Sequence, residues 1–302
     1  MPDPRDLDWE RDGADWPNRE MSRFVRAGRL KWHVQVGGEG PGLLLLHGTG
    51  ASTHSWAGML GPLARDFTVI APDLPGHGFT GSASLYGLSL PGMAYGVSEL
   101  LDALGQKPVL GVGHSAGAAI LAQLVLQGPS TLRAVISLNG ALVPFGGVAG
   151  RLFSPLAKLL AMNPVTPGLF ARGLSRSEAF ERLLAGTGSN LDPSSAAAYR
   201  RLAASPRHVA GALGMMANWD LRRLHREVKA LPIPLFLVAA AGDGTVPPDQ
   251  ARALARHVPT ARLEMLSWGG HLAHEERPAE IVDLIRRVSD EIGVQNGVPR
   301  DS

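Results

Sequence analysis

The chain has 302 residues, of which 45% are hydrophobic and 19% charged, and its formal net charge is +2. This composition is that of a globular protein, and we expect one domain that carries an insertion. The chain has no cysteine, which excludes disulfides, thiolate metal sites and a cysteine nucleophile. Its basic residues form no long run, so we expect no nucleic-acid partner.

Residues 1–21 are a polar arm with scattered acids and no apolar stretch. Such an arm resembles neither a secretory signal nor a membrane anchor, and we expect a cytoplasmic location. Apolar and polar residues then alternate over 22–28 and 30–38. This alternation predicts an antiparallel hairpin with one buried face.

Continuous apolar runs follow the hairpin, with helical stretches between most of them. They occupy residues 43–46, 67–71, 108–113, 132–138 and 234–240. Such runs are typical of parallel strands that are covered on both faces. The sequence therefore predicts an α/β fold with a mostly parallel, doubly wound sheet.

The alternation stops between residues 141 and 231, an interval far longer than a simple crossover needs. Prolines and charges interrupt its apolar runs, which predicts several short helices and excludes a membrane span. We expect this interval to be a helical cap. The expected core is then residues 22–140 and 232–302, preceded by the arm.

The sequence from Gly113 to Gly117 reads Gly-His-Ser-Ala-Gly between an apolar strand and an alanine-rich helix. Small flanking residues permit a sharp strand-to-helix turn that exposes the Ser115 hydroxyl at the helix start. Ser115 is therefore the candidate nucleophile, and the Ala116 amide is a candidate oxyanion donor. The alternative is a chance Gly/Ser/Ala helix start.

A second glycine-rich turn, residues 47–50, directly follows the strand at 43–46. The Thr49 amide is the candidate for the second oxyanion donor, although a plain turn has the same composition. We interpret His47 as a hydrogen-bonded structural residue. The turn at 73–78, which starts with Asp73, is interpreted as structural and as one wall of the pocket.

A serine nucleophile needs a histidine base, which in turn needs a carboxylate to orient it. Asp243 follows the apolar run at 234–240 and is the candidate acid. The other place for the acid, after the preceding strand, holds the uncharged Asn139. Asp249 lies beyond two prolines at an expected helix start, where an acid has a simpler explanation.

His271 follows a glycine pair after the last expected strand and is the candidate base. His274 lies nearer the last helix, where we expect it to cap or pack. The segment from His271 to Glu275 has neither the order nor the flanks of a zinc helix, so we expect no metal and no cofactor.

With four motifs in this order, residues 22–292 resemble the α/β-hydrolase family. The resemblance implies the catalytic triad Ser115, Asp243 and His271. Ala240 departs from it, since the acid loop often begins with glycine.

Five further segments resemble the magnesium-chelatase accessory hydrolases of bacteriochlorophyll biosynthesis. They are residues 15–20, 47–56, 137–150, 152–160 and 214–221. This narrower resemblance implies a role near magnesium insertion into protoporphyrin IX, with chelatase subunits as partners.

Residues 141–177 contain no Asp or Glu, and basic residues are interspersed there with Phe, Met and Leu. This composition suits a flat hydrophobic ligand with carboxylates, such as a porphyrin, and Arg151 and Lys158 are the candidate contacts. It also suits peripheral contact with an anionic membrane. The plain alternative is an ordinary cap with solvated bases and its own apolar core.

Three functions fit these residues. The first is an esterase-like hydrolase that acts through the triad, and the second is a non-catalytic porphyrin-binding or chelatase-assisting scaffold. The third is a cofactor-free haloperoxidase-like enzyme or a carbon–carbon bond hydrolase. A dehalogenase or epoxide hydrolase is disfavoured, because those enzymes use aspartate where this chain has Ser115.

Overall fold

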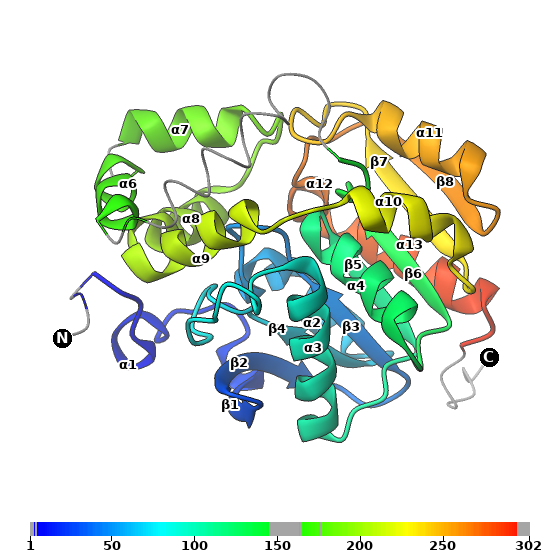
Figure 1. The fold of residues 1–302 in the computed structure, drawn as a ribbon, viewed down its shortest axis with the longest axis horizontal. Coiled ribbons are helices and arrows are strands. Elements are labelled where there is room, and N and C mark those ends of the chain that lie inside the picture. Colours follow the sequence, from blue (N-terminus) through cyan, green and yellow to red (C-terminus); the bar gives the residue numbers. More distant parts are fainter. Residues whose placement is uncertain (1–2, 4, 145–162, 164, 175–176, 295–302) are drawn as a thin grey trace.

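The computed structural model describes residues 3, 5–144, 163, 165–174 and 177–294. Its centre is a sheet of eight strands in the spatial order β1-β2-β4-β3-β5-β6-β7-β8 (Figure 1). The strands are β1 (Ser22–Ala27), β2 (Leu30–Gly37), β3 (Gly42–Leu46), β4 (Thr68–Pro72), β5 (Leu110–His114), β6 (Ala134–Leu138), β7 (Leu235–Ala240) and β8 (Ala261–Leu266).

Only the N-terminal strands run antiparallel to their neighbours. β1 and β2 form the expected hairpin, with Ala27 opposite Leu30, and β2 is also antiparallel to β4. All other neighbouring pairs are parallel. This topology confirms the predicted α/β class with a mostly parallel, doubly wound sheet.

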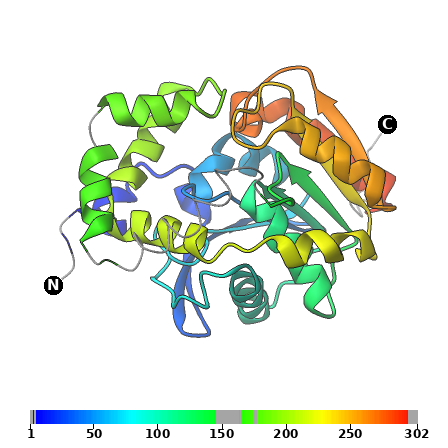
Figure 2. The same ribbon diagram turned by 45° about the horizontal axis from the view of Figure 1, so that its top comes forward.

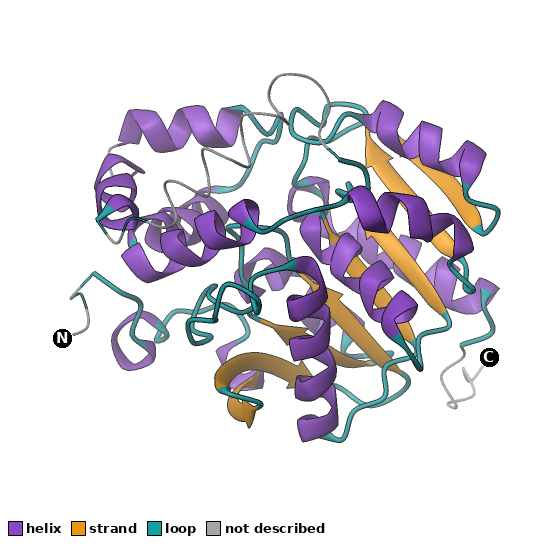
Figure 3. Ribbon diagram, in the orientation of Figure 1, coloured by secondary structure: helices purple, strands orange, loops and turns teal. Residues whose placement is uncertain are grey.

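Helices cover both faces of the sheet, as Figure 3 shows. On one face α3 (Leu90–Leu104), α4 (Ala116–Gln127), α10 (Arg222–Glu227) and α11 (Pro248–His257) contribute to one apolar core. On the other face α2 (Ala57–Leu63) and α13 (Pro278–Glu291) contribute to a second core. Alternate β3 residues enter the two cores, since Leu44 belongs to the first and Leu43 to the second. This two-sided burial explains why the predicted strands read as continuous apolar runs.

Four helices between β6 and β7 lie together beside the sheet (Figures 1 and 2). They are α6 (Thr166–Leu174), α7 (Ser177–Ala185), α8 (Pro193–Ala204) and α9 (Pro206–Ala217). Prolines set their starts, because Pro193 and Pro206 each occupy a first helical position after a capping Asp192 or Ser205. α10 and the short helix η3 (Val228–Ala230) then lead back to β7.

The N-terminal arm packs against both the core and the helices of this insertion. It contains α1 (Trp9–Asp12) and η1 (Arg19–Met21). Leu7 and Trp16 are buried in one cluster with Phe79 and with Leu202 of α8. None of the helices in the described part of the chain has the length and apolarity to span a bilayer.

Candidate active site

Ser115 lies at the sharp turn between β5 and α4, at the carboxyl edge of the sheet. Its backbone has φ 51° and ψ −114°, a conformation that non-glycine residues rarely adopt. The amide of Ser115 donates to Leu138 O at 3.0 Å, and its carbonyl accepts from Ala141 N at 3.0 Å. These bonds hold the strained residue between β5 and the end of β6.

The two glycines around Ser115 are required by close backbone contacts. A Cβ at Gly113 would overlap the backbone of Ala118, and a Cβ at Gly117 would overlap the carbonyl oxygen of Leu46. Both obstacles are backbone atoms that cannot move aside. The Gly-x-Ser-x-Gly pattern is therefore a steric condition for this turn.

Asp243 and His271 are joined by a hydrogen bond. The Nδ1 atom of His271 lies 2.9 Å from Oδ2 of Asp243, and both residues are less than 10% exposed. The other carboxylate oxygen accepts the amides of Thr245 at 2.7 Å and Val246 at 2.8 Å. A carboxylate only accepts hydrogen bonds, so we assign the proton to Nδ1, which leaves Nε2 as a base.

The alternative acid lies in a different environment. The Asp249 side chain is 85% exposed on the first turn of α11 and pairs with Arg252 at 2.6 Å. It has no contact with His271. Of the two carboxylates considered from the sequence, the structure thus brings only Asp243 to the histidine.

Asn139, which occupies the other place for an acid, supports the histidine loop. Its Nδ2 donates to the carbonyl oxygens of Gly270 and His271, each at 2.9 Å. Its Oδ1 accepts the Ala240 amide at 2.8 Å. The side chain thereby ties the ends of β6 and β7 to the loop that carries the candidate base.

His114 places the histidine loop against the serine turn. This residue immediately precedes Ser115, and its Nε2 donates to the carbonyl oxygen of His271 at 2.9 Å. The two imidazole rings are 4.7 Å apart. Burial lowers the pKa of His114 well below its usual value, so the ring is neutral. Sequence reasoning assigned no role to His114.

The turn at residues 47–50 lies beside the serine. A Cβ at Gly48 would be 3.1 Å from the Cβ of Ser115, so the backbone of this turn closely approaches the serine side chain. The Thr49 hydroxyl donates to Met215 Sδ on α9 at 3.3 Å. Ala116 is the first residue of α4, where an amide has no partner within its own helix.

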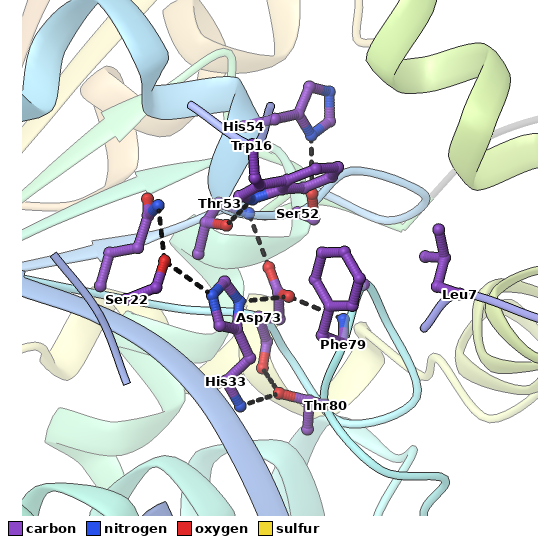
Figure 4. A network of polar contacts seen from close by, with 12 residues as sticks. Leu7, Trp16, Ser22, His33, Ser52, Thr53, His54, Asp73, Phe79 and Thr80 are labelled. Atoms are coloured by element: carbon purple, nitrogen blue, oxygen red, sulfur yellow. Dashed lines mark hydrogen bonds and ion pairs between the residues drawn. The ribbon is translucent and has the colours of Figure 1, made fainter. Parts of the chain in front are cut away.

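His47 and Asp73 have structural partners, as expected. His47 Nε2 accepts the Leu74 amide at 2.9 Å. The buried Asp73 carboxylate accepts Thr53 N at 2.7 Å and pairs with His33 at 2.8 Å (Figure 4). Burial alone would raise the pKa of Asp73, but the His33 ring, with His47 and the Phe79 amide, outweighs burial and lowers the pKa. Asp73 therefore fastens the turn after β4 to β2 and to residue 53.

His274 packs beneath the site on α12 (Ala273–Glu276), in a buried polar cluster. Its Nε2 lies 2.9 Å from Ser55 Oγ, and its ring is 4.9 Å from that of Trp56. Glu275 accepts from Ser55 at 2.5 Å and from Tyr199 of α8 at 2.6 Å. Burial raises the pKa of Glu275 to about 8 and lowers that of His274 to about 3. Both side chains are thus uncharged at neutral pH.

The expected ligand contacts Arg151 and Lys158 lie outside the described residues. A surface hollow of about 610 Å³ lies between the N-terminal arm and α6. Its lining includes Arg5, Arg172 and Arg207 but no residue of the Ser115, Asp243 and His271 set. Within the described ranges, no three His, Cys, Asp or Glu side chains are grouped to hold a metal ion.

Sequence comparisons relate the chain to proteins with hydrolase names and to a chelatase subunit. A model of the alpha/beta hydrolase fold matches residues 41–278. The magnesium-chelatase 30 kDa subunit of Rhodobacter capsulatus is 40% identical over 275 residues, which cover 90% of this chain and 94% of that protein. Pyrrolizixenacetamide deacetylase of Xenorhabdus hominickii is 26% identical over 275 residues, with coverages of 87% and 96%.

Solved structures share the fold. The epoxide hydrolase CorEH superposes with a TM-score of 0.77 at 21% identity, and the alignment covers 90% of this chain and 99% of that one. A thermophilic esterase from Thermogutta terrifontis gives 0.69 at 22% identity, with coverages of 90% and 98%. Identities this low establish a common architecture and leave the chemistry to the site residues.

Proposed function

The chain belongs to the α/β-hydrolase fold family, and from this premise we propose that it is a serine hydrolase. Ser115 is the nucleophile, His271 the general base and Asp243 the acid that orients the base. The observation that carries this proposal is the buried Asp243–His271 pair, whose histidine loop contacts the serine turn through His114.

In the proposed reaction, Ser115 Oγ attacks a carbonyl carbon while His271 Nε2 takes the hydroxyl proton. Asp243 keeps the imidazole in the required tautomer and stabilises the imidazolium that forms. The tetrahedral intermediate collapses when His271 returns the proton to the leaving group. Water then attacks the acyl-enzyme, again with His271 as base, and Ser115 regains its proton.

We propose the amides of Thr49 and Ala116 as the oxyanion hole. The close approach of Gly48 to Ser115 and the position of Ala116 at a helix start support this assignment. Backbone amides at such positions stabilise negative charge as it develops on the carbonyl oxygen.

For the substrate we propose a hydrophobic ester or a tetrapyrrole, held under a cap of residues 141–231. The acid-free composition of residues 141–177 supports a ligand with carboxylates, for which Arg151 and Lys158 are the proposed partners. The same composition supports peripheral contact of a cytoplasmic protein with the photosynthetic membrane.

The proposal is tested with a fluorophosphonate and intact-protein mass spectrometry. We expect one adduct on Ser115, because a serine beside a histidine base and an oxyanion hole is activated for attack on phosphorus. The Ser115→Ala variant should give none, and His271→Ala should react about 10³-fold more slowly or worse. An unlabelled wild-type protein would refute the assembled triad.

The second candidate function is a scaffold that assists magnesium chelatase by binding porphyrin or a chelatase subunit. The 40% identical relative named as a chelatase subunit favours it. Complementation of pigment synthesis in a phototroph that lacks the protein separates the two functions. A catalytic role requires that Ser115→Ala fails to restore pigment, whereas full restoration would identify a scaffold.

A further inference from the structure

A short turn of the insertion lies between the loops that carry the candidate acid and base. Residues 186–189 begin the connection from α7 to α8, and in Figures 1 and 2 this connection runs toward the loops after β7 and β8. The carbonyl oxygen of Thr187 accepts the His271 amide at 2.9 Å and the Gly244 amide at 3.2 Å. One atom of the insertion thus bridges both loops.

A second bond fixes the same turn to the histidine loop. The Ser189 hydroxyl accepts the amide of Leu272, the residue after His271, at 2.8 Å. The turn is itself held in shape, because the Thr187 hydroxyl donates to Leu184 O at 2.6 Å and accepts the Ser189 amide at 3.2 Å. These internal hydrogen bonds fix the turn in the shape in which Thr187 and Ser189 accept hydrogen bonds from the acid and base loops.

Glycines let the three backbones meet. A Cβ at Gly188 would overlap the carbonyl oxygen of Gly242, and a Cβ at Gly270 would overlap the backbone of Gly188. A Cβ at Gly244 would overlap the carbonyl oxygen of Gly186. Gly188 also has φ +72°, which favours glycine on its own account. No side chain separates the turn from the two loops, so a displacement of one backbone must displace the others.

α8 adds a further contact between the insertion and the chain that follows His271. Its Tyr199 hydroxyl donates to Glu275, four residues after His271, at 2.6 Å. The segment from 187 to 199 thus contacts the histidine loop at one end and the following helix α12 at the other.

We infer that residues 186–189 are a positioning element of the active site, in which Gly188 and Ser189 hold Asp243 and His271 in register. This inference rests on the proposed function. It also means that the insertion is coupled to the site, since a displacement of residues 186–189 relative to the sheet would change the Asp243–His271 geometry.

The test compares Gly188→Ala and Ser189→Ala with the matched control Gly173→Ala. Gly173 lies on α6 in the same insertion, and a Cβ there meets nothing within 4 Å. We expect fluorophosphonate labelling to slow about 10²-fold in Gly188→Ala, as for a displacement of about 1 Å in a reacting group. Loss of one hydrogen bond in Ser189→Ala should cost about tenfold. The control should label like the wild type.

A second readout reports the Asp243–His271 geometry directly. The hydrogen-bonded His271 Nδ1 proton should give a low-field NMR resonance in the wild type and in Gly173→Ala, and it should shift or disappear in the other two variants. If Gly188→Ala does not fold, by circular dichroism, Ser189→Ala carries the comparison.

The outcomes separate this inference from the proposed function. Wild-type labelling rates and an unshifted resonance in both test variants would overturn the positioning role. A wild type that does not label would refute the serine hydrolase, and the resonance, which needs no reactivity, would still test the positioning role.

Discussion

Replacing Glu275 by Gln should remove a pH-dependent loss of stability. The Glu275 side chain is only 3% exposed, and burial raises its pKa from an ordinary 4.5 to about 8. Glutamine has nearly the same shape as the protonated acid and can accept from Ser55 and Tyr199 in the same way. It cannot ionise, so it removes the titration and keeps the hydrogen bonds.

The direction of this pH dependence follows from how many protons Glu275 binds in the folded and in the unfolded protein. Between pH 4.5 and 8 the unfolded chain loses the Glu275 proton while the folded protein keeps it, so folding becomes less favourable as pH rises. This contribution to stability is fully present below pH 4.5 and is lost as pH approaches 8. The slope is about 1.4 kcal/mol per pH unit, and from pH 5 to 8 the loss amounts to about 3 to 4 kcal/mol.

The assay is urea denaturation of wild type and Glu275→Gln at pH 5, 6, 7 and 8. The buried His114 and His274 titrate in both proteins, so the difference between the two free energies of unfolding isolates Glu275. We expect this difference to grow with pH in favour of the glutamine variant. Glu280→Gln, at a surface carboxylate with a 51% exposed side chain, serves as the control and should follow the wild type. If the free energies of unfolding of the wild type and of Glu275→Gln change in parallel with pH, Glu275 is not a buried neutral acid.

Three further expectations concern the site and its ligand. Asp243→Asn should lower the rate of Ser115 labelling about 10⁴-fold with the fold intact, because the amide favours the wrong imidazole tautomer. Asp249→Asn should change this rate little, and the opposite ranking would reassign the acid. Asn139→Ala should lower the free energy of unfolding by about 1 to 3 kcal/mol, because it leaves buried backbone groups without a partner, and an unchanged urea midpoint would contradict this. Protoporphyrin IX should bind with micromolar affinity and shift the Soret band, with weaker binding after Arg151→Ala and Lys158→Ala; no saturable binding at high micromolar porphyrin would favour a smaller ester.

The sequence predicted the sheet and its helices well, because their signals are local. Strands buried on both faces must be apolar throughout. Each predicted apolar run starts within two residues of the first residue of an observed strand. The serine turn was predictable from its short motif, in which Gly113 is required by the nearby Ala118 backbone of α4 and Gly117 by the more distant carbonyl oxygen of Leu46 on β3.

The supports of the site could not be predicted, because each joins segments that are far apart in the chain. Asn139 was considered only as an uncharged residue in the place of an acid, whereas its amide bonds residues 131 and 132 positions away. The Gly186 to Ser189 segment reads as an ordinary polar turn. Nothing periodic in the sequence indicates that its glycines meet Gly242 and Gly270.

The positive φ of Ser115 sets stability against reactivity at a single position. A serine there carries strain of about 1 to 3 kcal/mol that glycine would relieve, since glycine has no Cβ. A Ser115→Gly protein should therefore resist heat better than the wild type while losing the proposed nucleophile, and Ser115→Ala, which keeps the Cβ, should lose the proposed nucleophile without that gain. Equal melting temperatures of Ser115→Gly and Ser115→Ala would show that the positive φ at this position carries no such cost.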